Sequence, residues 1–187
     1  MRKFFLSVWE IAEVVFISAG TVLLIRTFLV QPFLVSGPSM EPNFKNGDYL
    51  IIDELTYRFR EPERGEVVVF RYPQDSKVFF IKRVIGRPGE RVVNRDGRLV
   101  AYPDGAADSA VLVSEPYLSP ESRTGDFDVT LGPGEYYVLG DNRSYSFDSR
   151  NWGAVGRGHI VGLVRLRIFP LGQFGAVFPP NYAQATP

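Results

Sequence analysis

A serine between two prolines is the first candidate for chemistry in this sequence. Ser39 directly follows Pro38 and stands three residues before Pro42, with Gly37 two residues before it. The prolines stiffen the local backbone, and the glycine leaves one side of it free of bulk. Such a loop can present a serine hydroxyl to a carbonyl carbon, with backbone N–H groups nearby to stabilise an oxyanion. Taken alone, the segment is more typical of a plain turn.

A serine nucleophile needs a base, and the sequence offers two candidates. His159 stands at the start of a predicted strand, and we interpret it as a structural or surface residue. Lys82 lies in an apolar run, where strand alternation places it on one face with Phe80 and Val84. Burial there would lower the lysine pKa by several units from about 10.4, which would make the amine a base near neutral pH. A solvated lysine on an edge strand fits the same pattern.

The composition excludes several other kinds of site. The 187 residues include no cysteine and one histidine, which excludes disulfides, zinc–thiolate sites, iron–sulfur clusters and multi-histidine metal cages. We therefore expect no metal ion and no cofactor. The 21 basic and 21 acidic side chains give no net charge, which argues against a nucleic-acid partner. Apolar residues make up 45%, enough for a buried core.

The N-terminal part of the chain has the character of a membrane anchor. Residues 14–25 carry no charge, and the apolar character resumes after Arg26. Because a bilayer core needs about 20 helical residues, we place a transmembrane helix at about residues 11–30, ended by Pro32. A buried core helix is one alternative, and a signal segment cleaved after Gly37 is another.

The charges around this segment indicate its orientation. Arg2, Lys3 and the N-terminal amine precede it, whereas only Arg26 and Lys45 lie close behind it. The positive-inside rule favours a single-pass protein of the cytoplasmic membrane, with its N-terminus in the cytoplasm and the rest on the outer face. The lipid bilayer is thus an expected partner.

From residue 47 onward, β-branched and aromatic runs alternate with turn signals. The predicted strands are residues 49–52, 67–70, 78–81, 91–93, 135–139 and 160–168, and residues 54–61 fit one or two helical turns. We expect a mainly β protein, with a cytoplasmic stub and anchor at 1–35 and an all-β barrel or pair of packed sheets at 36–187. Residues 95–133 contain fewer apolar runs and are interpreted as an inserted hairpin or lid.

Four segments resemble, in order, the sequence boxes of bacterial type I signal peptidases. They are residues 39–42, residues 64–70, residues 82–90, and residues 140–143 with Ser146, Asp148, Ser149 and Arg150. The similarity extends from the apolar segment to about residue 165. It implies a membrane-bound serine endopeptidase whose catalytic domain is a pseudo-barrel of coiled antiparallel sheets. Such an enzyme removes signal peptides from exported preproteins with a Ser-Lys dyad.

The resemblance also implies roles for individual residues. Ser39 corresponds to the nucleophile, Lys82 to the general base and Ser146 to the hydroxyl that orients the lysine amine. Four further residues correspond to supports of the site: Asp141 and Arg143 for the surrounding loop, and Asp148 with Arg150 as an ion pair.

The residue two positions before Ser39 differs from the one that supplies an oxyanion donor in part of the family. Some members have a serine two positions before the nucleophile, where this chain has Gly37. The backbone N–H of Ser39 is then expected to stabilise the oxyanion, and Ser36 is a second candidate.

The resemblance implies two apolar pockets for an extended substrate. Their expected lining is Phe33, Val35, Met40, Phe44, Val69, Phe80 and Ile81. Such pockets would accept small side chains at the third and first positions before the cut, the Ala-x-Ala pattern of secretory signal peptides. The expected partners are signal peptides of secreted preproteins, close to the export translocon.

Two other functions fit parts of the sequence. Self-cleaving repressors use a similar β fold and Ser-Lys pair in the cytosol, but they need a DNA-binding N-terminal domain where this chain has an apolar segment. A membrane-tethered β domain that binds extended peptides without cutting them is the second alternative.

Overall fold

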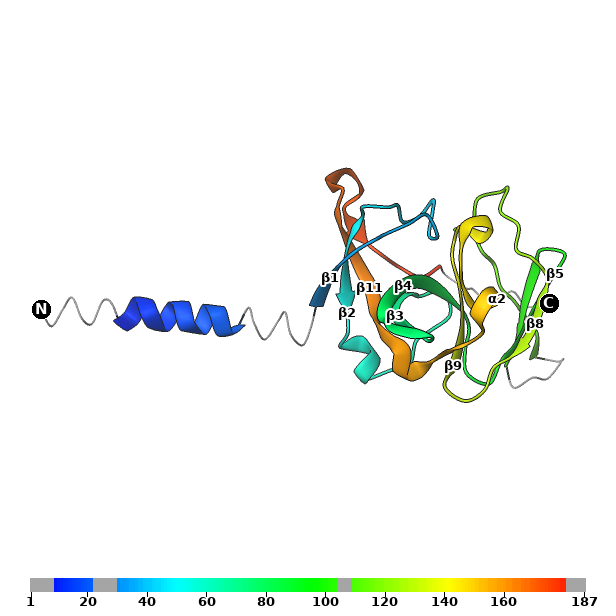
Figure 1. Ribbon diagram of the computed structural model, residues 1–187, viewed down its shortest axis with the longest axis horizontal. Coiled ribbons are helices and arrows are strands. Elements are labelled where there is room, and N and C mark those ends of the chain that lie inside the picture. The colour runs from blue at the N-terminus through cyan, green and yellow to red at the C-terminus, as the bar shows by residue number, and fades with distance from the viewer. Residues whose placement is uncertain (1–8, 22–29, 104–108, 181–187) are drawn as a thin grey trace, which may run out of the picture.

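The computed structural model describes residues 9–21, 30–103 and 109–180, and its strands form two antiparallel sheets. Figure 1 shows the larger sheet at one end of the β domain and β5 and β8 of the smaller sheet at the other. The larger sheet contains β1 (Val30–Leu34), β2 (Tyr49–Asp53), β3 (Val67–Tyr72), β4 (Asp75–Gly86), β9 (Glu135–Leu139), β10 (Val155–Gly156), β11 (Ile160–Phe169) and β12 (Gly175–Ala176).

The larger sheet is strongly curved. Its strand order is β1-β2-β11-β3-β4-β9-β10, and β12 pairs with β11. The pairing of β11 shifts register at three places, once against β3 and twice against β2. Such irregularities bend a strand and increase its twist. The sheet therefore has two packed faces, each with its own apolar cluster.

Strand β3 shows how the sequence builds these two clusters. Val67 and Val69 belong to one cluster, and Val68 and Phe70 belong to the other. All four side chains are at most 2% exposed. A strand buried on both faces needs a continuous apolar run rather than an alternating one, and Val67–Phe70 is such a run.

The smaller sheet has the order β7-β6-β5-β8. It contains β5 (Arg91–Arg95), β6 (Arg98–Tyr102), β7 (Val111–Leu112) and β8 (Phe127–Thr130). The segment 95–133, expected from the sequence to be an inserted hairpin or lid, contains more strands than one hairpin. It supplies three strands and part of a third apolar cluster, to which Leu99 and Ala101 contribute. A sheet packed on one face needs only alternate apolar residues, so the segment has no long apolar run.

The six predicted strands are all present, and β4 is longer than predicted because it continues from Asp75 to Gly86. Residues 54–61 contain one short helix, as expected. The described helical turns of the β domain are η1 (Thr56–Arg58), η4 (Arg143–Tyr145), α2 (Ser149–Trp152), η5 (Arg157–His159) and η6 (Leu171–Gln173). The sequence analysis does not predict β1, β6, β7, β8, β10 or β12.

The N-terminal segment differs from the prediction at its C-terminal end. Residues 9–21 are helical, and residues 22–29 lie outside the described part of the chain. Val30–Leu34 forms β1, so the expected helix does not extend to residue 30, and Pro32 lies within a strand. Among the described strands β1 pairs only with β2, and an edge strand tolerates proline. The β sheet therefore begins before the expected boundary at residue 36.

No helix within residues 9–21, 30–103 and 109–180 is long and apolar enough to cross a membrane.

Candidate active site

Strand β4 and the loop between β1 and β2 bring Ser39 and Lys82 together. The Lys82 ammonium nitrogen donates a hydrogen bond to Ser39 Oγ at 2.6 Å and another to the Ile81 carbonyl oxygen at 3.0 Å. Lys82 is 3% exposed, and its Nζ lies 5.4 Å from the centre of the Phe80 ring. The predicted shared face of Lys82, Phe80 and Val84 is confirmed, since Phe80 and Val84 pack in one cluster.

The protonation of Lys82 is governed mainly by its burial. Burial lowers the pKa of Lys82 from 10.5 to about 8. The negative charges of Asp148 and Asp141 raise this pKa in part, and the Arg150 charge lowers it again. In mildly alkaline solution a large fraction of the amine is therefore neutral and can accept the serine proton across the same 2.6 Å.

Backbone hydrogen bonds fix the loop that carries Ser39. The Asn142 N–H donates to the Ser39 carbonyl at 3.0 Å, and the Asn142 side-chain amide donates to the Pro38 carbonyl at 3.1 Å. On the other side, the fully buried Met40 anchors the loop in the apolar cluster. The Ser39 N–H donates to no described residue, so it remains available to an oxyanion. Ser36 is exposed, and the structure records no contact between it and either member of the pair.

Gly140 lies where the two halves of the site meet. A Cβ atom at this position would overlap both the Ser146 hydroxyl and the Ser39 carbonyl oxygen. Only glycine therefore allows the Ser39 loop and the Ser146 segment to approach so closely. The Ser146 hydroxyl is buried and has no hydrogen bond to a described residue, so the predicted hydrogen bond from Ser146 to Lys82 is absent from this structure.

Asp148 and Arg150 form the predicted ion pair. The Arg150 guanidinium donates two hydrogen bonds of 2.8 Å to the Asp148 carboxylate. The Gly140 N–H donates a third, at 3.0 Å, and Asp148 also caps α2. Burial alone would raise the pKa of Asp148, but these hydrogen bonds and the Arg150 charge lower it on balance. The Ser146 hydroxyl contributes slightly to this lowering without the geometry of a hydrogen bond.

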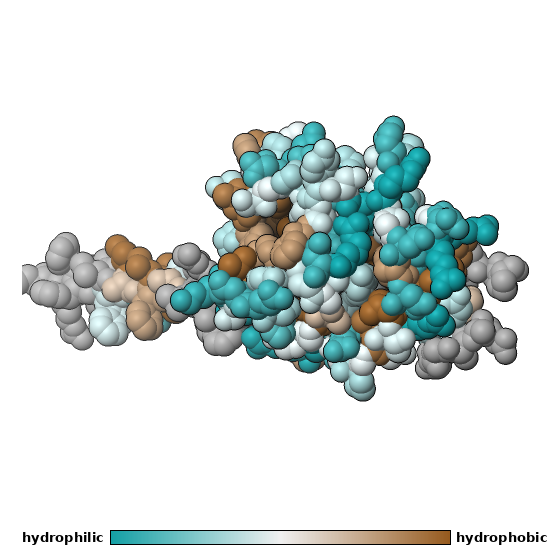
Figure 2. Space-filling view, turned by 45° about the vertical axis from the view of Figure 1, so that its right-hand side comes forward, coloured by the Kyte–Doolittle hydropathy of each residue, from teal (hydrophilic) through white to brown (hydrophobic). Residues whose placement is uncertain are grey.

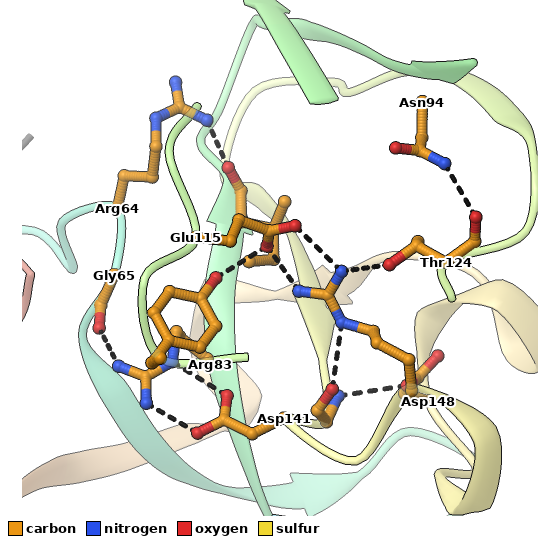
Figure 3. Close-up of polar contacts among 12 residues, drawn as sticks. Arg64, Gly65, Arg83, Asn94, Glu115, Thr124, Asp141 and Asp148 are labelled. Carbon is orange, nitrogen blue, oxygen red and sulfur yellow. Dashed lines mark hydrogen bonds and ion pairs between the residues drawn. The ribbon is translucent and has the colours of Figure 1, made fainter. Parts of the chain in front are cut away.

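The loop residues Asp141 and Arg143 have partners that the sequence analysis does not identify. Arg83 donates to the two Asp141 oxygens at 2.8 and 2.6 Å, while Arg143 pairs with Glu115. Figure 3 shows Arg83 directed at Asp141, and Glu115 and Thr124 directed at one guanidinium, that of Arg143. Strand alternation places Arg83 on the face of β4 opposite Lys82, and this was the one sequence signal that could have suggested Arg83 as the partner of Asp141. No local pattern connects Glu115 to the site.

Six of the seven predicted pocket residues lie together. The cluster contains Val35, Met40, Phe44, Val69 and Ile81, with Phe33 packed against it. Phe80 is separated from them, because it neighbours Ile81 on β4 and so points to the opposite face. Its ring packs against Phe70, Tyr72 and Phe147 instead. Phe80 therefore borders Lys82 rather than this cluster.

Within the described ranges no group of three or more His, Asp or Glu side chains could hold a metal ion.

Comparison with known proteins identifies the family of this chain. A model of the family "Signal peptidase, peptidase S26" matches residues 8–169. The chain belongs to the S26 signal peptidase family. It is therefore a serine peptidase, a hydrolase, as the sequence analysis predicts.

Named relatives cover nearly the whole chain. Signal peptidase I of Bacillus amyloliquefaciens is 37% identical over 173 residues, 87% of this chain and 86% of that protein. Probable signal peptidase I-2 of Synechocystis is 38% identical over 157 residues, 81% of this chain and 68% of that protein. A signal peptidase I crystal structure from Enterococcus faecalis aligns with a TM-score of 0.47 and 32% identity, covering 56% of this chain and 97% of that one.

Proposed function

We propose that this S26 peptidase removes N-terminal signal peptides from exported preproteins, cutting after Ala-x-Ala-like sites with Ser39 as nucleophile and Lys82 as general base. One observation carries the proposal: the 2.6 Å contact between Ser39 Oγ and a lysine nitrogen that is almost completely buried. A structural lysine would gain more from solvent than from this position, because burying an ammonium without a carboxylate partner costs free energy.

The proposed reaction has two steps. Neutral Lys82 accepts the Ser39 proton while Oγ attacks the scissile carbonyl, and the Ser39 N–H stabilises the oxyanion. The ammonium then donates a proton to the leaving amine, and the acyl-enzyme ester forms. In the second step neutral Lys82 takes a proton from water as its oxygen attacks the ester carbonyl, and the ammonium then returns this proton to Ser39 Oγ as the bond between Oγ and the acyl carbon breaks.

The sheet edge near Ser39 supports the proposed binding of an extended substrate. Among the described strands β1 is an edge, and it leads directly into the Ser39 loop. A peptide added beside it would place alternate side chains against the apolar cluster of Val35, Met40 and Ile81. These side chains are at most 5% exposed, so little room remains. We infer that only small residues fit at the first and third positions before the cut.

We also propose that the N-terminal segment tethers the enzyme to the cytoplasmic membrane as a single-pass anchor, with its N-terminus in the cytoplasm and the β domain on the outer face near the translocon. The helix at residues 9–21 exposes a row of large apolar side chains: Trp9, Ile11, Val14, Val15, Phe16 and Ile17. Figure 2 shows apolar residues gathered on this helix. The uncharged run 14–25 and the basic residues before it support this orientation.

The decisive experiment incubates the purified full chain with a labelled preprotein in detergent and locates the cut by mass spectrometry. We expect one cut after Ala-x-Ala. Ser39→Ala and Lys82→Ala should each lower turnover at least about 1000-fold, because the nucleophile or its base is removed.

Matched controls are Ser114→Ala and Lys77→Ala, which change exposed residues and should keep wild-type turnover. Circular dichroism of all four variants checks the fold. Near-normal turnover by Lys82→Ala would disprove the dyad. If no preprotein is cut but peptides still bind to both site variants, the protein is a binding module.

A further inference from the structure

A cavity adjoins the apolar cluster of Val35, Met40 and Ile81, at the end of the cluster far from Ser39. This cavity of about 240 Å³ is lined by Gln31, Phe33, Ile52, Glu54, Val69, Phe79 and Val161. Most of this lining is apolar, and only Gln31 and Glu54 bring polar side chains to it. The cavity is not part of the predicted pockets, although it shares Phe33 and Val69 with them.

Strand geometry places this cavity in line with the proposed substrate path. Gln31 and Phe33 of β1 share one face because side chains alternate, and Val35, directly after the strand, continues this alternation. Gln31 and Val35 are four positions apart, which corresponds to roughly 13 Å in an extended chain. Phe33 lies between them, and its ring is 6.4 Å from that of Phe79 on β4. The cavity is therefore continuous with the apolar cluster and further along β1 from the nucleophile.

Glu54 gives this cavity a chemical preference. Leu50, Ile52 and Glu54 alternate along the same face of the β2 segment, and the first two belong to the apolar cluster. One Glu54 carboxylate oxygen, Oε1, is buried and has no hydrogen bond to any residue that the structure describes. A buried carboxylate oxygen without a donor is costly, so a turn of the Glu54 side chain that brings this oxygen to a donor supplied by a ligand in the cavity would be favourable.

We propose that this cavity is a further substrate subsite, which takes a hydrogen-bond-donating side chain from the fifth residue before the cut and pairs it with Glu54. The inference depends on the proposed function, because it assumes a peptide lying along β1. If the first residue before the cut lies near Val35 and the third near Phe33, alternation brings the fifth to Gln31 and Glu54. A lysine fits best, since its stem can lie on the apolar lining while its ammonium reaches the carboxylate.

The test measures kcat/KM of the full-length enzyme on one preprotein with lysine, methionine or glutamate at the fifth position before the cut. We expect the lysine substrate to exceed the methionine substrate about tenfold, the usual size of a charge-assisted hydrogen bond, and the glutamate substrate to be the poorest. Glu54→Gln should remove most of this difference, and Glu54→Lys should reverse it in favour of glutamate.

Two controls make the result specific. Glu63→Gln alters an exposed carboxylate, with a side chain 64% accessible, and should leave the lysine preference intact. The same substitutions at the fourth and sixth substrate positions should show no coupling to Glu54, because those side chains point away from the cavity.

The outcomes separate the two proposals. If wild-type enzyme cuts no preprotein, the proposed function is wrong. If it cuts preproteins but does not discriminate at the fifth position, or if Glu54→Gln changes all substrates equally, the subsite is wrong and the proposed function stands. Equal changes would mean that Glu54 stabilises the structure of the enzyme and does not contact the fifth substrate residue.

Discussion

At the scale of single residues, the chemistry depends on opposing effects at Lys82. Burial favours the neutral amine, while the carboxylates of Asp148 and Asp141 favour the ammonium. Both carboxylates are themselves neutralised by arginines, Asp148 by Arg150 and Asp141 by Arg83. Burial outweighs what remains of the carboxylate effect, which leaves the Lys82 pKa at about 8 rather than above 10.

The pH dependence of cleavage tests this balance. The proposed function makes the neutral form of Lys82 the general base, so it predicts that kcat/KM rises with pH and levels off above the Lys82 pKa of about 8. The measurement is the initial rate on a preprotein at low substrate concentration between pH 6 and 10. A profile without an ascending limb would contradict a lysine base.

The same shift predicts a pH-dependent stability. Folding lowers the Lys82 pKa, so the unfolded chain holds the proton more tightly between about pH 8 and 10.5. Below pH 8 the folded state therefore carries the full free-energy cost of burying the Lys82 ammonium. This cost disappears as the pH rises to 10.5, so the protein becomes more stable over that range. The gain in free energy of unfolding of the Lys82→Met variant over wild type should be largest below pH 8.

This advantage should shrink by about 3 kcal/mol as the pH approaches 10.5. Urea unfolding of both proteins at several pH values measures it, and the Lys77→Met variant, altered at an exposed lysine, serves as the control. A stability difference that is constant with pH would show that Lys82 is not shifted.

At the scale of elements, the insert between β5 and β9 holds the site together. Arg143 follows the Asp141 loop and is bound by Glu115 and Thr124, both from the insert. Tyr117, also from the insert, lies with its ring 3.9 Å below the Arg83 guanidinium and accepts a hydrogen bond from Asn43 at its carbonyl. The insert therefore connects the Ser39 loop, β4 and the Asp141 loop.

Removing Glu115 should reveal this role. The Arg143 side chain is 1% exposed, so Glu115→Ala leaves a buried charge without its partner and should cost about 3–5 kcal/mol of stability. Cleavage should fall as well, because Asn142, next to Arg143, holds the Ser39 loop. Urea unfolding and kcat measure the two effects. Glu121→Ala, an exposed carboxylate in the same insert, is the matched control and should change stability by less than about 0.5 kcal/mol.

At the scale of the whole molecule, the boundary between the N-terminal helical segment and the β domain decides which truncations fold. β1 pairs with β2 along its full length, and Val35 is buried directly after it. A chain without residues 1–29 keeps these contacts, whereas a chain without residues 1–35 loses an entire strand of the larger sheet.

We expect the chain lacking residues 1–29 to fold and to cleave a short soluble peptide at nearly the full-length rate. It should cleave a preprotein in vesicles at least about tenfold more slowly, because tethering no longer confines enzyme and substrate to one surface. The chain lacking residues 1–35 should unfold at lower urea concentration. Comparable vesicle activity of the first truncation and the full chain would contradict the proposed anchor.

Local patterns in the sequence were sufficient for part of this account. The strands around Val67 and Tyr136 follow from continuous runs of β-branched and aromatic residues, and the apolar face around Lys82 follows from side-chain alternation. Both signals involve only neighbouring residues. The resemblance of four ordered segments to a known family predicts the family correctly, and it makes Ser39 and Lys82 the candidates for nucleophile and base. The continuation of an N-terminal helix to residue 30 was wrong, because an apolar run near Pro32 fits a helix and an edge strand alike.

Only the tertiary structure decided which distant residues meet. Ser39 and Lys82 are 43 positions apart, and their 2.6 Å contact joins the loop after β1 to β4, which are not neighbours in the larger sheet. The partnership of Arg143 with Glu115 and the unpaired Glu54 oxygen likewise arise from chain segments that no local period relates. Side-chain periodicity fixes which face a residue occupies, whereas the closure of the sheet and the path of the insert determine what lies opposite that face.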